Sequence, residues 1–70
     1  MANYFCAKIP QEHSEFLRLL ALEFGVSNEN IFFSPIGCQF CKLCIYIKFE
    51  KIETLKKFSE LSAPFIIEKL

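Results

Sequence analysis

The sequence predicts an α+β domain that covers residues 1–70, with one four-stranded antiparallel sheet and two helices on one face of it. Two observations lead to this prediction. Two segments alternate apolar and polar residues with the two-residue period of a strand, two shorter apolar segments are bounded by turn residues or proline, and two segments repeat apolar residues at the spacing of a helix. The order along the chain is β-α-β-β-α-β, and no linker, internal repeat or low-complexity stretch interrupts it. We therefore expect a single domain.

The first strand is expected at residues 3–9, where Pro10 ends the alternation. Its side chains divide into two sets that face opposite sides of the sheet. The set expected in the core is Phe5, Ala7 and Ile9, and the set expected on the other face is Tyr4, Cys6 and Lys8.

A helix is expected at residues 11–24, with Gly25 positioned to end it. Leu19 and Leu22 lie off its apolar stripe, and we expect them at the surface. The stripe itself consists of His13, Phe16, Leu17, Leu20, Ala21 and Phe24.

Two strands follow, a short one at residues 31–34 and a stronger one in the segment "LCIYIKFE", residues 43–50. In the second of these, Leu43, Ile45, Ile47 and Phe49 are expected in the core, and Cys44, Tyr46, Lys48 and Glu50 on the other face.

Residues 51–62 return to helical spacing, and "FIIEKL", residues 65–70, is expected to form the closing strand after Pro64. The apolar stripe of this helix is Ile52, Leu55, Phe58 and, at its edge, Leu61. A right-handed crossover in each half gives the strand order 4-1-3-2, with both helices on one face. This is the ferredoxin-like "split βαβ" architecture.

Four cysteines are the residues best suited to bind a metal ion. Cys38, Cys41 and Cys44 follow one another at a spacing of three, and the sheet topology brings Cys6 near Cys44 as a diagonal neighbour. Four thiolates are a common ligand set for structural zinc. We therefore interpret them as a candidate zinc site, with redox or persulfide chemistry and ordinary apolar packing as alternatives. His13 belongs to the core stripe on the other side of the sheet, so it is a weaker candidate ligand.

The segment "KLCIYIKF", residues 42–49, resembles the RNP1 segment of RNA-recognition motifs through Lys42, Tyr46, Ile47 and Phe49. The resemblance implies single-stranded RNA binding, with Tyr46 stacking on a base. Larger residues replace the small ones of that pattern, and Cys44 replaces its first aromatic residue. Eight basic residues balance eight acidic ones, so the chain has no overall electrostatic attraction for nucleic acid or for an anionic membrane.

Composition favours protein binding over catalysis. Apolar residues make up 53% of the chain and include nine Phe, more than a domain of this size easily buries. We expect a non-enzymatic regulatory module that binds another protein or its own copy through Tyr4, Tyr46, Leu19 and Leu22, with Phe32 and Ile66 as further candidates on the open sheet face. An inhibitor of viral or mobile-element type, which binds and blocks a host protein, is an alternative form of the same activity.

No Ser-His-Asp order, glycine-rich phosphate loop or HExxH motif occurs, so we expect no enzymatic activity. The amino terminus lacks the basic and apolar regions of an export signal, and no segment is long and apolar enough to span a membrane. The expected location is the cytoplasm, where clustered thiols remain reduced.

Overall fold

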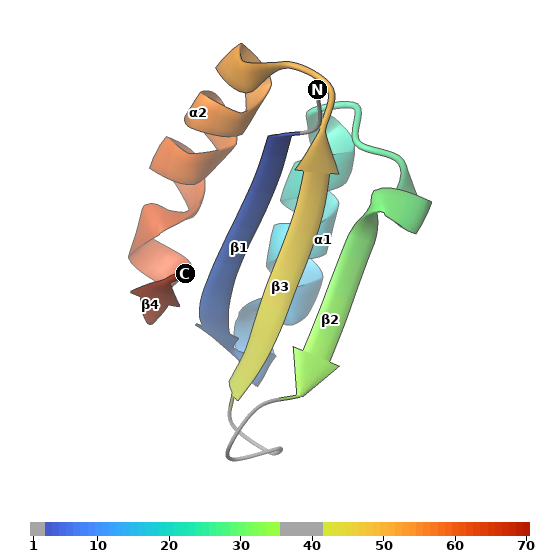
Figure 1. Ribbon diagram of the computed structural model, residues 1–70. Helices are drawn as coiled ribbons and strands as arrows, with labels where there is room; N and C mark the ends of the chain where they lie inside the picture. Colours follow the sequence, from blue (N-terminus) through green and yellow to red (C-terminus); the bar gives the residue numbers. More distant parts are fainter. Residues whose placement is uncertain (1–2, 36–41) are drawn as a thin grey trace.

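The computed structural model describes residues 3–35 and 42–70, which form one antiparallel sheet and two helices (Figure 1). The strands are β1 (Asn3–Pro10), β2 (Ile31–Pro35), β3 (Lys42–Phe49) and β4 (Glu68–Lys69), and the helices are α1 (Ser14–Glu23) and α2 (Ile52–Ser62). Short 3₁₀ turns precede α1 and β2 and follow α2, at Gln11–His13, Asn28–Asn30 and Ala63–Phe65. The expected α+β class, with four antiparallel strands and two helices, is confirmed.

The strands lie in the order β2-β3-β1-β4, which reads 4-1-3-2 from the β4 edge. β1 and β3 form the centre of the sheet, paired from Asn3 opposite Phe49 to Pro10 opposite Lys42. β2 pairs with β3 over five residues, whereas β4 pairs with β1 over only two. The central pair therefore sets which side chains share a face.

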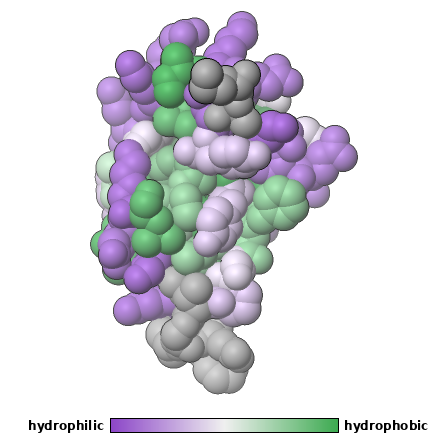
Figure 2. All heavy atoms as spheres, in the orientation of Figure 1, coloured by the Kyte–Doolittle hydropathy of each residue, from purple (hydrophilic) through white to green (hydrophobic). Residues whose placement is uncertain are grey.

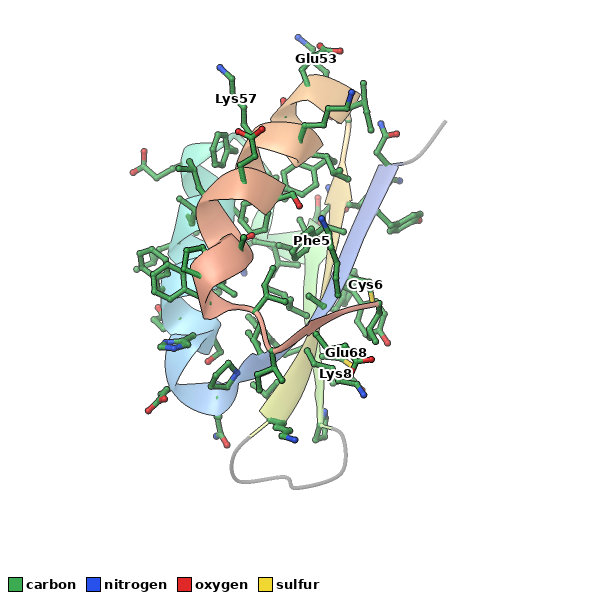
Figure 3. All side chains as sticks on the ribbon, turned by 90° about the vertical axis from the view of Figure 1, so that its left-hand side faces the viewer. Phe5, Cys6, Lys8, Glu53, Lys57 and Glu68 are labelled. Carbon is green, nitrogen blue, oxygen red and sulfur yellow. The ribbon has the colours of Figure 1, made fainter. Side chains whose placement is uncertain are left out.

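Both helices lie against the same face of the sheet, and the core fills the space between the two layers (Figure 3). Phe58 of α2 lies at the centre of this core. Its ring centroid is 4.9 Å from that of Phe5, 5.3 Å from that of Phe49 and 6.1 Å from that of Phe24. Such ring pairs add edge-to-face attraction to the hydrophobic gain of burial. The buried core residues are Phe5, Ala7, Ile9, Leu17, Ala21, Val26, Ile31, Ile45, Ile47, Phe49 and Phe58.

Gly25 ends α1 as the sequence predicts. It has φ of +83°, the left-handed conformation that glycine adopts without a Cβ clash. The Gly25 N–H donates to the carbonyl of Leu22 at 3.0 Å, and the Val26 N–H donates to that of Ala21 at 3.2 Å. This is the Schellman arrangement, which satisfies the last carbonyls of the helix and buries Val26 against the core.

The first helix differs from its expected form in extent and in its buried face. It begins at Ser14, because residues 11–13 form a 3₁₀ turn. Phe16 is exposed rather than buried, and its ring centroid lies 4.7 Å from that of Phe65. Leu22, which we expected at the surface, is half-buried and packs against the core.

The second helix buries a different line of residues from the expected one. Ser62 follows Phe58 by one helical turn and is fully buried, while Ile52 and Leu61 are exposed. The helix is therefore rotated so that Phe58 and Ser62 approach the sheet, which leaves Leu61 on its flank.

The closing strand is also shorter than the sequence predicts. Residues 63–65 continue α2 as a 3₁₀ turn, so β4 contains only Glu68 and Lys69. Ile66 packs against the core and does not lie on the open sheet face.

Candidate functional site

The side of the sheet that carries no helix is the most distinctive surface of the molecule. We call it the open face and define it by the residues that β1, β2 and β3 direct away from the helices, which are Tyr4, Cys6, Lys8, Pro10, Phe32, Ser34, Lys42, Cys44, Tyr46 and Lys48. Figure 3 shows Cys6 and Lys8 pointing away from both helices, while Phe5 points toward α2. The alternation of the strands thus gives one face to the core and the other to this site.

Three aromatic side chains cross the open face. Tyr4 is 64% exposed, Phe32 57% and Tyr46 39%. Tyr46 pairs directly with Phe32 of β2, and Tyr4 lies diagonally from Tyr46 on β1. In Figure 2, which views this side, pale and green residues occupy the middle of the sheet and hydrophilic ones gather around them. The face therefore offers aromatic contact surface on three adjacent strands.

Two thiols lie within this aromatic band. Cys6 pairs with Tyr46, and Cys44 pairs with Lys8 and Ser34, so the two cysteines are diagonal neighbours, as the alternation predicts. Cys6 is half-buried, whereas Cys44 is only 3% exposed although it lies on the open face. A thiol that is buried in this way is shielded from solvent reagents.

Tyr46 lies beside Cys6 and on the same face as Cys44. The Cys6 thiol, through its hydrogen bond and charge, raises the pKa of Tyr46 above its ordinary value, and Cys44 adds a smaller effect of the same kind. A thiolate disfavours a phenolate beside it, because both carry negative charge. Cys6, Cys44 and Tyr46 therefore form one group of neighbouring titratable side chains.

The structure brings together two of the four expected zinc ligands. Cys6 and Cys44 share the open face, whereas Cys38 and Cys41 lie outside the described residues. Residues 3–35 and 42–70 contain no group of three or more His, Cys, Asp or Glu side chains placed to hold a metal ion. His13 lies in the helical layer, where its ring packs against Phe65 at 5.2 Å, so it does not approach the cysteines.

The four expected partner-binding residues do not form one surface. Tyr4 and Tyr46 are on the open face, but Leu19 is 50% exposed on α1, in the layer behind the sheet. Leu22 is half-buried against the core on that same helix. The sequence could show that the leucines lie off the main stripe, but the way α1 rests on the sheet decides which surface each one joins.

The open face carries three lysines, Lys8, Lys42 and Lys48, one of which is neutralised by an ion pair. Lys8 is paired with Glu68 of β4 at 3.1 Å, and Lys48 is exposed beside Tyr4. Of the positions matched to RNP1, Tyr46 is exposed on this face, Ile47 and Phe49 are buried in the core, and Cys44 occupies the place of the first stacking aromatic residue. Of the two RNP1 positions at which aromatic side chains stack on bases, only the position of Tyr46 is aromatic here.

A pocket of about 280 Å³ lies at one end of the domain, between the turn that ends α1 and the start of α2. The sequence analysis did not anticipate it, because its lining comes from segments far apart in the chain. Its titratable side chains are those of Lys48, Glu50 and Lys51, of which Glu50 and Lys51 are adjacent in sequence. It contains no histidine or cysteine, so it lacks the usual nucleophile and base pairs.

Comparison of the chain with protein-family models, with curated proteins and with solved structures finds no match in any of the three. Among the described residues, neither helix is long and apolar enough to cross a membrane. The geometry of the open face is therefore the basis for assigning a function.

Proposed function

We propose that this chain is a non-enzymatic ferredoxin-like module that binds another protein through the open face of its sheet. The observation that carries the proposal is the exposed aromatic band of Tyr4, Phe32 and Tyr46 on a sheet face that no described helix covers. Aromatic residues are enriched in the centres of protein interfaces, where they contribute large contact area at small entropic cost. A regulatory module, or an inhibitor that blocks its target, would both act in this way.

The charges around the band indicate the chemistry of the partner. Lys8 is neutralised by Glu68, whereas Lys42 and Lys48 on the same face form no ion pair with another described residue. A complementary partner has an apolar patch to cover the aromatic rings and a carboxylate near its rim to meet Lys48. A nucleic acid would need a wider basic surface than this one.

The test uses two variants that add the same charge on opposite sides of the molecule. A partner captured on the immobilised wild-type chain is identified and then titrated with purified variants by calorimetry. We expect Tyr4→Lys to weaken binding at least about tenfold, which is the loss of about 1.4 kcal/mol. We expect Leu19→Lys, at an exposed site on α1, to leave the affinity within about twofold.

Circular dichroism confirms that both variants remain folded. Equal weakening by the two substitutions would contradict the assignment to the open face, and so would an unchanged affinity in Tyr4→Lys.

A thiolate zinc site is a second candidate function, favoured by the placement of Cys6 and Cys44 as diagonal neighbours on one face. The sequence supplies two further thiols, Cys38 and Cys41, which lie outside the described residues. Cys44 is shielded from solvent, as structural zinc ligands commonly are. If these four residues bind zinc, the ion stabilises the fold of a small domain.

Elemental analysis of the purified chain tests this second candidate. We expect one zinc per chain, and loss of that zinc in Cys6→Ser and in Cys44→Ser. Substitution of Ser34, which lies beside Cys44 and is not a cysteine, serves as the control and should retain the metal. Folded protein that contains no zinc after purification without a chelator would rule the zinc site out.

A further inference from the structure

The outer edge of β2 is a second surface whose chemistry indicates a partner. β2 pairs with β3 on one side, and no other described strand lies along its other side (Figure 1). In an antiparallel strand, alternate residues direct their N–H and C=O groups away from the neighbour. The β2 edge therefore presents backbone donors and acceptors to any strand that can lie beside it.

This edge lacks the features that usually prevent strands from pairing between molecules. The sequence of β2, "IFFSP", contains no charged residue, and only Pro35 at its end limits the length of a ladder. The opposite edge of the sheet differs. β4 is two residues long, both of its residues are charged, and Glu68 is held in an ion pair with Lys8. One edge of the sheet is thus protected and the other is open.

Apolar side chains flank the β2 edge on both sides of the sheet. Phe32 is exposed on the open face, and Phe33, on the helical side, is only half-buried. Both belong to the edge strand itself, so they would lie against whatever strand pairs there.

The helix behind the sheet adds Leu22 to the same flank. Arg18, one turn before Leu22, reaches the side chain of Asn28 just ahead of β2, with the Nη1 to Oδ1 distance 3.4 Å. That flank of α1 therefore lies on the β2 side, while Phe16 on the other flank packs against Phe65. Leu22 is half-buried, so part of it is available to a neighbour beyond the edge.

We infer that β2 pairs antiparallel with β2 of a second copy of this chain, which joins two four-stranded sheets into one sheet of eight strands. A two-fold axis through the edge produces antiparallel pairing of a strand with itself. Because β2 carries no charge, the two copies meet without repulsion, and Phe32, Phe33 and Leu22 of each copy face apolar groups of the other. The protected β4 edge stops further addition, so association ends at the dimer.

The small area of this contact limits the affinity that we expect for the dimer. A stable interface typically buries about 800 Å² on each partner, and a five-residue strand with three flanking side chains supplies less. We therefore expect a dimer that dissociates in the micromolar range, at roughly 1 to 100 μM. The inference goes beyond the open-face proposal because it concerns the edge of the sheet, which shares only Phe32 with the aromatic band. Either proposal can fail while the other holds, and Tyr4 on the central strand β1 distinguishes them.

Sedimentation equilibrium of the full chain in reducing buffer tests the dimer. We expect a concentration-dependent monomer–dimer equilibrium in the wild type, which Phe32→Lys weakens at least about tenfold because it adds a positive charge from each copy to the same face of the new strand pair. The matched control is Tyr4→Lys, which adds the same charge at an exposed aromatic position on a central strand and should dimerise like the wild type. A wild type that stays monomeric at about 1 mM overturns the inference, as does equal weakening by both variants.

Hydrogen exchange of the wild-type chain tests the edge directly and does not depend on a variant folding. We expect amides of β2 to exchange more slowly at high protein concentration than at low concentration, while amides of β1 keep the same rate. A dimer in which β2 gains no protection would show that another surface is used. Protection of β2 only after addition of a different protein would show that the edge serves a heterologous partner, which also overturns the inference.

Discussion

At the scale of single residues, Phe58 shows how much of this small core depends on one side chain. Its ring contacts three other phenylalanine rings, which come from β1, β3 and the end of α1. Phe58 therefore connects α2 both to the sheet and to the end of α1. A domain of this size has about 3–5 kcal/mol of stability available from such a core.

Replacement of Phe58 by alanine is expected to cost about 3–5 kcal/mol, which is enough to unfold most of the population at room temperature. Phe58→Leu keeps most of the volume, so we expect a folded protein with a free energy of unfolding lower by about 1–2 kcal/mol. Urea denaturation followed by circular dichroism measures both. Leu61→Ala, at an exposed position on the same helix, should change the stability by less than about 0.5 kcal/mol, and a larger loss there than in Phe58→Leu would contradict this account of the core.

Tyr46 gives a second prediction at this scale. In a Tyr4→Phe background it is the last tyrosine in the chain, so its phenol can be titrated alone by ultraviolet absorbance. The pKa of Tyr46 is raised chiefly by Cys6, so the midpoint should lie above the usual value of about 10 and should fall when Cys6→Ala is added. Cys44→Ala should lower it less, because Cys44 makes the smaller contribution.

The raised pKa of Tyr46 also makes the free energy of unfolding depend on pH. A phenol with a raised pKa in the folded state holds its proton better there than in the unfolded chain. Its contribution to stability is therefore complete below the unfolded value of about 10 and is lost as pH rises through the folded value. An unchanged midpoint after removal of Cys6 would show that the thiol does not act on Tyr46.

At the scale of elements, Gly25 controls the end of α1 and so the start of the chain's path toward β2. A Cβ at this position would meet no atom within 4 Å, so the cost of a substitution comes from the backbone conformation alone. We expect Gly25→Ala to lower the free energy of unfolding by about 1 kcal/mol and Gly25→Asn by less, because asparagine adopts positive φ more readily. Thermal and urea denaturation measure both, and a stabilising Gly25→Ala would contradict the Schellman assignment.

The elements also show what the sequence can and cannot predict. Strict alternation in β1 and β3 was sufficient to place Cys6, Tyr46 and the buried phenylalanines on the correct faces, because a strand has only two faces. A helix can rotate, so periodicity did not reveal that Ser62 would be buried and Leu61 exposed. The burial of Cys44 and the lack of protection at the β2 edge depend on neighbouring strands, which no single segment encodes.

At the scale of the whole molecule, the first strand in the chain is at the centre of the sheet. β1 pairs with β3 and β4, and contacts such as that of Lys8 with Glu68 join residues 60 positions apart. Each such contact requires closure of a long loop before it returns any stabilisation. Folding should therefore be slower than that of a helical bundle of equal length, with refolding in the range of about milliseconds to seconds.

Tyrosine fluorescence in a stopped-flow experiment measures this rate, since the chain contains no tryptophan. A refolding time in the microsecond range would contradict the view that long-range strand pairing limits the reaction.

The same placement of β1 has a consequence during synthesis. β1 is translated before both of its partner strands, β3 and β4. Until they emerge, Phe5 and Ile9 have no sheet to join, and the nascent segment keeps an apolar surface that a chaperone can bind. The central β1–β3 pair therefore cannot form until β3 has been translated, and β1 gains its second neighbour only with β4.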